Sequence, residues 1–598
     1  MIVKMQKLTL FVSANHKDDA LNKLKKLGLV HIHNINQPIS EDITSIETEL
    51  SNVERSLSII GLKNIEESDR SVDFLKTKSL VENIISLAST KDQLNNVLEE
   101  EKGKFNWFQT WGNVSMSEIE ELRNAGIYIR LYTSDKSYLK KLPEDRMIYV
   151  VNEDKYKVYL ALVSTEENST LDLKEEIIPA DNLKSVKDKI ASTEKELLQI
   201  NKKINDLSEF QADILAYQEK IKKRYEFANV KYGMENEESI SYLQGFCPEE
   251  STDIIKKEAD KESWGYVFEE PDDLSEVPTL IKNPRWIKII DPIFKFMGTV
   301  PGYQEYDISM WFLIFFSLFF AMLIGDAGYG FIFIVLTLWA RRKMPKAPSE
   351  PFILMYILGG ATVIWGLLSG TWFGLERIAQ IPFLKKCIIP SISSFDLSKH
   401  SFNDNQNIMM QLCFLIGAIH LTVAHLTSAL RNKKSLRALS QIGWIGIVWS
   451  LYFLAGTLVL RHEFPKMAKW PLLIGFFLAL VFTNPQKNII KGVASTLGSL
   501  PLDIIGAFSD VVSYLRLFAV GYATVMVAYS FNTMALGNGI NNIISGFIAA
   551  FILFLGHGLN IILGAMSIVV HGIRLNMLEF SGHLGMEWSG KEYKPFKE

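Results

Sequence analysis

The chain has 598 residues, of which 48% are hydrophobic and 22% are charged, with a formal net charge of −4. The charges are uneven, because residues 1–302 hold 94 of the 130 Asp, Glu, Lys and Arg side chains and residues 517–573 hold none. This distribution excludes a wholly soluble enzyme and a nucleic-acid binder that works through a basic patch, and it predicts a membrane domain in the second half. Three widely spaced cysteines exclude a disulfide scaffold and a cysteine-based zinc site.

Residues 1–35 predict a strand, a helix and a second strand, which together would form one lobe of a small α/β domain. Apolar residues then recur at alternating spacings of three and four, the seam of a left-handed coiled coil, over 41–104 and again over 181–229. The first seam runs through Ile43, Ile46, Leu50, Val53, Leu57 and Ile60 and resumes at Leu80, Ile84, Leu87, Leu94 and Val97. The second runs through Val186, Ile190, Thr193, Leu197, Ile200, Ile204, Leu207, Gln211, Ile214, Gln218 and Ile221. Between them, residues 105–180 are rich in β-branched and aromatic residues and predict strands.

A mainly α-helical protein follows, whose first 302 residues form a two-lobed rod. Two antiparallel coiled-coil segments would join a proximal lobe, made of 1–40 and 230–302, to a distal lobe at 105–180. Two unrelated helical hairpins are the alternative. The first residues become charged too soon for a signal peptide, so this half is expected in the cytoplasm.

The second half, residues 303–598, contains eight apolar runs and predicts a polytopic membrane domain of about eight helices. The runs are 309–324, 327–340, 351–374, 407–430, 440–460, 469–483, about 503–533 and 541–577. The first two are short and are split by GDAGYG, so they form either one broken helix or two short helices. Two helices place the Arg- and Lys-rich loops at 341–346 and 431–437 on the cytoplasmic side, as the positive-inside rule prefers. The last two runs exceed the bilayer thickness and should tilt.

No pattern for catalysis is present: the chain lacks a P-loop, a His-Glu-x-x-His and a Cys-x-x-Cys motif. We therefore expect no directly bound nucleotide, no metal and no cofactor. Arg516 and Arg574 are flanked by apolar residues on both sides. Because an arginine at mid-membrane costs about 2.5–3.5 kcal/mol, the pair indicates a water-accessible or protein-lined path. For Arg574, nearer the end of its run, snorkelling to the interface is the alternative.

Helical spacing adds polar residues to these two helices. One face would carry Asp503, Asp510 and Ser513, with Thr524 nearby; a stripe on the last helix would carry Asn560, Ser567, His571 and Arg574, with Glu579 beyond it. Such a pattern suits a path for H⁺ or Na⁺, whereas the stripe could also serve interhelical hydrogen bonding. Asp326, in the glycine-rich turn, is either part of the path or a local helix cap. His420, His425 and His557 are interpreted as packing or interfacial residues, with a role in a relay as the alternative.

SYLRLFAVGYA around Arg516 and GHGLNIILGAMSIVVHGIRLNMLEF around Arg574 resemble the two signature helices of the V/A-type rotary ATPase membrane stator subunit, called I in bacteria and archaea and a in eukaryotes. GDAGYG, SYLQGFCPEE, TVPGYQEYD and the opening MQKLTLFVSANHKDDALNKLKKLGLVHIH resemble further motifs of that family, in the same order. The resemblance extends over essentially the whole chain.

The resemblance implies a non-catalytic stator subunit that couples H⁺ or Na⁺ translocation to rotation and to ATP hydrolysis or synthesis. Arg516 would match the essential arginine and Arg574 the second one, while Asp503 and Asp510 match polar positions of bacterial relatives that line a half-channel. The implied partners are the proteolipid c/K ring, peripheral stalk subunits of the E/G type, a central-stalk-associated d/C-type subunit and the lipid bilayer of a bacterial or archaeal cell.

Two departures limit this transfer, and two other functions compete with it. Eukaryotic relatives carry His where this chain has Thr524 and Glu where it has Gly564, so their half-channel lining cannot be carried over. A secondary transporter would show inverted repeats with matching helix breaks, whereas only the break at 325–330 is visible. A membrane-anchored scaffold would explain the coiled coils but not two arginines on overlong helices.

Overall fold

The structure is a computed structural model that describes residues 1–61, 73–141, 146–237, 239–393, 402–485, 489–537, 539 and 542–597. The chain divides into two compact units. The first unit comprises Leu10–Lys26 and Ile32–Gln244, and the second comprises Met1–Thr9, Leu27–His31 and Gly245–Lys597. The predicted boundary at residue 302 separates cytoplasm from membrane and stays a prediction.

The strand-helix-strand prediction for the first residues is confirmed by β1 (Met5–Ser13), α1 (Lys17–Leu27) and β2 (His31–His33). These strands join others from the far end of the N-terminal half in a sheet of order β2-β7-β1-β8, with β6 paired to β7. The added elements are β6 (Glu235–Glu237), β7 (Ile240–Pro248), α7 (Thr252–Glu262) and β8 (Gly265–Glu269).

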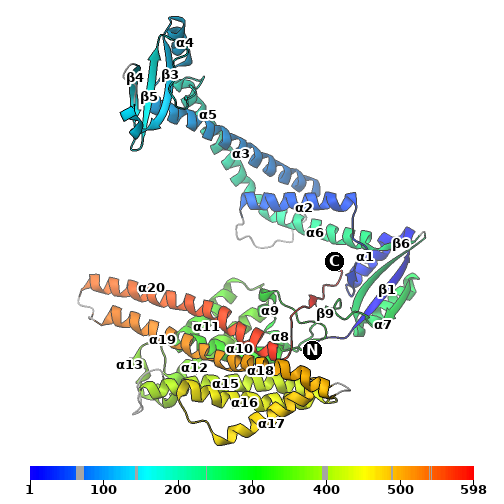
Figure 1. The fold of residues 1–598 in the computed structure, drawn as a ribbon. Coiled ribbons are helices and arrows are strands. Elements are labelled where there is room, and N and C mark those ends of the chain that lie inside the picture. Colours follow the sequence, from blue (N-terminus) through cyan, green and yellow to red (C-terminus); the bar gives the residue numbers. More distant parts are fainter. Residues whose placement is uncertain are drawn as a thin grey trace. The chain divides into compact units, whose positions relative to one another are not determined.

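Four long helices of the first unit form the predicted antiparallel coiled coil. They are α2 (Glu41–Ile60), α3 (Phe74–Trp111), α5 (Leu183–Leu207) and α6 (Gln211–Gly233). Figure 1 shows α2 alongside α6 and α3 alongside α5. Tyr232 donates to Asp42 and Tyr225 donates to Glu47, so the sequence numbers rise along one helix as they fall along the other.

The apolar seam is buried or half-buried where the spacing predicts it, except at Val97. Val53, Ile84, Ile214 and Ile221 are fully buried. Val97, expected in the seam, is 44% exposed, while Leu98 is buried. A register shift of this kind follows because 3.6 residues per turn drift against a repeat of 3.5 over a helix of this length.

The strand-rich prediction for residues 105–180 is also confirmed. The strands are β3 (Tyr128–Asp135), β4 (Met147–Glu153) and β5 (Lys157–Ser164), all antiparallel in the order β3-β5-β4. Helix α4 (Met116–Asn124) precedes them and begins with a capping box between Ser115 and Glu118.

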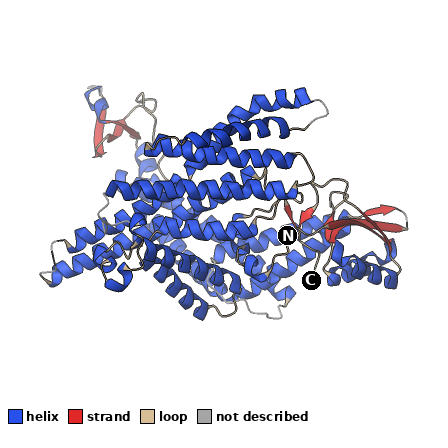
Figure 2. Cartoon of the chain, turned by 90° about the horizontal axis from the view of Figure 1, so that it is seen from below, coloured by secondary structure: helices blue, strands red, loops and turns tan. Residues whose placement is uncertain are grey.

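Helices dominate the second unit, as the colouring of Figure 2 makes plain. Each of the eight apolar runs contains a helix, although the third run extends beyond α12, which ends at Ser369. The long helices are α10 (Ser309–Ile324), α11 (Ala327–Lys343), α12 (Ser349–Ser369), α15 (Phe402–Arg431), α16 (Arg437–Leu460), α17 (Lys469–Phe482), α18 (Ile489–Ser513), α19 (Leu515–Leu536) and α20 (Ile543–Ser567). Short helices are α8 (Arg285–Lys288), α9 (Asp291–Met297), α13 (Glu376–Ala379), α14 (Pro382–Lys385) and α21 (Ser581–His583).

The predicted number of eight spans stays a prediction. By length and composition, five helices of the described residues could cross a membrane, or up to six if the bent pair α10–α11 counts as one span. This pair is two helices bent by 118° at Gly325 and Asp326. The two long final runs are confirmed as helical stretches of 47 residues (Ile490–Leu536) and 41 residues (Ile543–His583). The first of them begins well before residue 503, where its apolar run starts.

The end of the chain returns to residues far away in the sequence. Strand β10 (Lys591–Glu592) pairs in parallel with β9 (Pro278–Thr279). Beyond it, the Phe596 amide donates to the Val30 carbonyl at 2.8 Å. The C-terminal segment is thus part of the second unit's own packing.

Candidate functional site

Three charged side chains meet in the second unit. Arg516 lies at the start of α19, and Arg574 and Glu579 lie in the continuation of α20. Arg516 Nη2 donates to Glu579 Oε1 at 2.7 Å, and Arg574 Nε lies 3.6 Å from the same oxygen. Two guanidinium groups therefore share one carboxylate, and the trio keeps one positive charge in excess. We call these three residues the arginine site.

Burial differs within the arginine site. The Glu579 side chain is 4% exposed, that of Arg516 24% and that of Arg574 53%. A buried carboxylate is stable only when it is paired, which the arginines provide. Arg516 has five N–H donors, and among the described residues only its Nε and Nη2 find acceptors. Its exposed edge can therefore receive a second anion.

A helix break holds Arg516 in place. Helix α18 ends at Ser513 and α19 begins at Leu515, with Tyr514 between them. The last carbonyls of a helix lack intrahelical partners, and Arg516 Nε donates to the Ser513 carbonyl at 3.1 Å. The break thus supplies an acceptor that orients the guanidinium toward Glu579.

A wider helical turn brings Glu579 to Arg574. Beyond α20 the backbone is π-helical over Ile568–Gly572 and again over Leu575–Phe580. In an α-helix, residues five apart differ by about 140° around the axis, so Arg574 and Glu579 would face apart. In a π-helix the hydrogen bonds run from i to i+5, which places residues five apart above one another. The π segment is therefore what lets one carboxylate serve both arginines.

A chain of hydrogen bonds lies one helical turn from Glu579. His583 Nε2 is 3.1 Å from Asp510 Oδ2, and His583 Nδ1 is 3.1 Å from His425 Nε2. His425 Nδ1 is 2.7 Å from Gln441 Oε1. Four residues from α15, α16, α18 and α21 thus form a continuous polar chain, which we call the histidine chain.

A third histidine, His420, packs among aromatic side chains beside the helix break at Tyr514. His420 is fully buried and its Nδ1 lies 2.8 Å from the hydroxyl of Tyr514. Its ring stacks on Phe580 and on Phe315, with centroids 4.3 and 3.9 Å apart. This arrangement matches the packing role that the sequence suggested for His420.

A third polar group lies further along α19 and α20. Asn560, predicted as a path residue, donates to the Tyr329 hydroxyl at 3.0 Å and to the Thr524 carbonyl at 2.8 Å. His557 Nδ1 lies 2.7 Å from the same hydroxyl, and its Nε2 lies 3.2 Å from Asn532 Oδ1. This network joins α11, α19 and α20 by hydrogen bonds between helices.

The structure favours the cap interpretation of Asp326. The side chain is fully buried and is the N-cap of α11. Oδ1 accepts the backbone N–H groups of Gly328, Tyr329 and Phe373, and Oδ2 accepts that of Gly374. Four backbone donors already occupy this carboxylate.

The structure brings some of the predicted site residues together and leaves others apart. Arg516, Arg574 and Glu579 meet directly, and Ser513 contributes its carbonyl. Asp510 lies in the histidine chain, whereas Asn560 and Asp326 lie elsewhere. Asp503 is exposed, and His571 is half-buried with no partner for Nδ1 among the described residues.

Sequence reasoning missed His583 and Gln441 and treated His425 as a packing residue. His583 is 73 residues from Asp510 and 158 from His425, so no local spacing connects them. The one available signal was His583 itself, which follows His557 and His571 in the same segment and lies one turn beyond Glu579.

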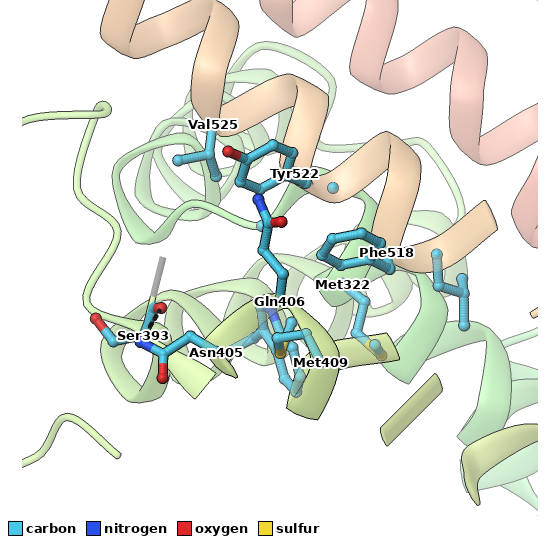
Figure 3. Close-up of a pocket in the computed structure, with 12 residues that line it drawn as sticks. Met322, Ser393, Asn405, Gln406, Met409, Phe518, Tyr522 and Val525 are labelled. Carbon is cyan, nitrogen blue, oxygen red and sulfur yellow. Dashed lines mark hydrogen bonds between the residues drawn. The ribbon is translucent and has the colours of Figure 1, made fainter. Parts of the chain in front are cut away.

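A small cavity lies beside α19 (Figure 3). It has a volume of about 40 Å³, enough to hold water, and its lining includes Leu517 and Phe518, which directly follow Arg516. Tyr522, Asn405 and Gln406 supply polar atoms, and none of the lining residues is charged. The cavity can therefore hold water beside α19 but supplies no fixed charge of its own.

The fold and site define a class: a protein with an antiparallel coiled-coil domain, several helices long and apolar enough to cross a membrane, and two arginines that share a buried carboxylate. Comparison with known proteins agrees. The chain is 31% identical over 625 residues to V-type ATP synthase subunit I of Borreliella burgdorferi, covering 100% of both chains. The chain belongs to the V-type and A-type ATP synthase subunit I family.

Other relatives carry the same name. V-type ATP synthase subunit I 1 of Treponema pallidum is 29% identical over 639 residues and 100% of both chains. A-type ATP synthase subunit I of Methanocaldococcus jannaschii is 24% identical, over 81% of this chain and 74% of the relative. The crystal structure of the cytoplasmic N-terminal domain of subunit I, homologue of subunit a, of V-ATPase covers 44% of this chain at 16% identity. Its TM-score of 0.27 is too low to support an argument. No family model matches the chain.

Proposed function

We propose that this subunit of a rotary ATPase is its non-catalytic stator, which carries ions past Arg516 to a rotating ring of proteolipid subunits. The family membership supports the setting, a membrane-embedded subunit of a V/A-type ATP synthase. The observation that carries the ion-path role is the arginine site, a partly exposed permanent cation beside a buried carboxylate.

The proposed chemistry rests on charge pairing. A ring carboxylate that reaches the exposed edge of Arg516 is stabilised as the anion and releases its ion. When it rotates into lipid it must be neutral or ion-bound, because a bare charge there is costly. Glu579 supports this step by holding Arg516 in place when no ring carboxylate is present. The fixed cation thereby prevents direct leakage between two half-channels, and ion flow requires rotation.

The energy available is set by the membrane potential. Each charge that crosses is driven by about 2.3 kcal/mol per 100 mV. The antiparallel coiled coil supports a further role as a strut that resists torque, with peripheral stalk subunits of the E/G type and a d/C-type central-stalk subunit as its partners. The host membrane would be that of a bacterial or archaeal cell, with the first half of the chain in the cytoplasm.

Arg516→Ala tests this function. Because alanine removes the cation that receives the ring carboxylate, we expect the reconstituted complex to lose ATP-driven ion uptake while its soluble sector still hydrolyses ATP. Arg377→Ala, at an exposed position of α13, is the matched control and should transport normally. An Arg516→Ala complex that pumps at the control rate would refute the assignment.

A further inference from the structure

We propose that Asp510, His583 and His425 form a proton-selective relay to the arginine site, so that the ion carried by this subunit is H⁺ and not Na⁺. This inference rests on the proposed function and deepens it, because neither the family nor the arginine site distinguishes the two ions. Three features of the histidine chain support the relay: where its two ends lie, how many protons it holds in its two states, and which ligand atoms it offers to an ion.

The histidine chain has one end near a basic loop and the other near Arg516. Gln441 lies in the first turns of α16, directly after the loop at 431–437 that the positive-inside rule assigns to the cytoplasm. From there the chain passes through His425, which is 3% exposed, and His583, whose side chain is 11% exposed. It ends at Asp510, whose side chain is 34% exposed. The chain therefore crosses buried protein between two more accessible ends.

The exposed end lies next to the arginine site. Asp510 precedes Ser513 by three residues on α18, so both lie on one face, and the Ser513 carbonyl accepts from Arg516. On the other helix, His583 follows Glu579 by four residues. A proton that leaves Asp510 is thus released beside the surface where the ring carboxylate would meet Arg516.

Hydrogen-bond directions along the chain define a loaded state. Gln441 Oε1 can only accept, so the facing His425 Nδ1 carries a proton and His425 Nε2 accepts from His583 Nδ1. His583 Nε2 is then a lone pair, and its contact with Asp510 requires one proton between nitrogen and oxygen. In the loaded chain that proton is held on Asp510 or shared with His583.

The unloaded state is the same chain with every bond reversed. The Gln441 amide is turned so that its N–H donates to His425 Nδ1, His425 Nε2–H donates to His583 Nδ1, and His583 Nε2–H donates to ionised Asp510. The two states differ by one proton. A proton that enters at His425 Nδ1 shifts each N–H bond by one link and emerges on Asp510, and no heavy atom beyond the Gln441 amide has to move. Each imidazole takes one proton on one nitrogen and gives one from the other.

The same chemistry does not suit a sodium ion. Hard cations are held by several oxygen ligands, such as carboxylates, backbone carbonyls and water. Two links of the chain end on imidazole nitrogens at 3.1 Å, a distance that holds a shared proton and leaves no room for an ion between the atoms. Among the described residues, no group of three His, Cys, Asp or Glu side chains is placed to hold a metal ion.

The test uses the whole ATPase complex reconstituted in vesicles, with His425→Gln and His583→Gln. Glutamine keeps a donor and an acceptor but cannot pass a proton from one ring nitrogen to another. We expect the native complex to acidify the vesicles in Na⁺-free buffer and both variants to lose at least about tenfold of that rate, since a positioned proton-transfer group is worth this much or more. His462→Gln, at an exposed loop position, should keep the native rate.

Three results would overturn the relay. One is ²²Na⁺ uptake by the native complex that a protonophore leaves intact. The second is H⁺ uptake by both glutamine variants at the control rate. If a buried histidine variant fails to assemble, Asp510→Asn replaces it, because the Asp510 side chain is one-third exposed. The third result that would overturn the relay is a native transport rate in Asp510→Asn.

The same vesicles separate this inference from the proposed function. If Arg516→Ala stops transport while His583→Gln and Asp510→Asn transport at the native rate, the relay is wrong and the stator function stands. If Arg516→Ala also transports normally, the proposed function itself fails.

Discussion

Glu579 illustrates how the site depends on single residues far apart in the sequence. Its carboxylate reaches Arg516, 63 residues earlier, and Arg574, five residues earlier. The two arginines could be predicted because they bound a stretch without any other charge. Their shared partner could not, since an α-helical period places Glu579 on a different face from Arg574, and only the π turn corrects it.

The sequence leaves two roles open for Asp326, part of the ion path or a local helix cap, and the structure favours the cap. Asp326→Ala should destabilise the second unit, because four buried backbone N–H groups lose their acceptor and each unpaired group costs about 1–3 kcal/mol. We expect a clearly lower unfolding temperature of the detergent-purified complex by intrinsic fluorescence. Asp326→Asn keeps the oxygen that accepts three of the four bonds, so it should be milder and should transport ions normally once assembled. Loss of transport in an assembled Asp326→Asn complex would return this residue to the ion path.

Close helix contacts decide the architecture of the second unit. At Gly521 of α19, an added Cβ would lie 2.2 Å from the Met322 carbonyl oxygen of α10. Helix association in membranes relies on such small residues, because lipid supplies no hydrophobic driving force between helices. Gly521 lies five residues after Arg516 on α19, so we expect a displacement of α19 at this contact to move Arg516 as well.

Gly521→Ala should therefore push α19 away from α10, lower the unfolding temperature of the complex and reduce coupled transport. Gly506→Ala is the matched control on α18, since its added Cβ meets nothing within 4 Å. Alanine there should be neutral or stabilise the helix by about 0.5–1 kcal/mol. Equal unfolding temperatures for the two variants would contradict this prediction and would show that α10 and α19 can separate without loss of stability.

At the scale of the whole molecule, the C-terminal return constrains the membrane topology. Strand β10 pairs with β9, and Phe596 hydrogen-bonds to Val30, so we expect the end of the chain and the segments around residues 30 and 278 to lie on one side of the membrane. The helices between them must then cross an even number of times. An even number is met by the predicted eight crossings, and also by six if the bent pair α10–α11 forms one span, so this expectation argues against five.

Cysteine labelling checks this topology. In a Cys387→Ser background, where the other two cysteines are buried, Lys597→Cys should react with a membrane-impermeant maleimide from the same side as a cysteine introduced in the segment around residue 278. Met467→Cys, which is 83% exposed between α16 and α17, should react only from the opposite side. Labelling of both from one side would contradict the eight-helix arrangement.

Local patterns in the sequence determined the domain division and most of the secondary structure of this protein. Charge distribution separated the two halves, heptads located the coiled coil, β-branched residues located the strands, and apolar runs located the helices, because each depends on neighbours within a few turns of the chain. Only the tertiary structure decided which polar groups meet. The pairing of Arg516 with Glu579, and of Asp510 with His583 and His425, arises from helix breaks, π turns and packing between helices that no period in the sequence records.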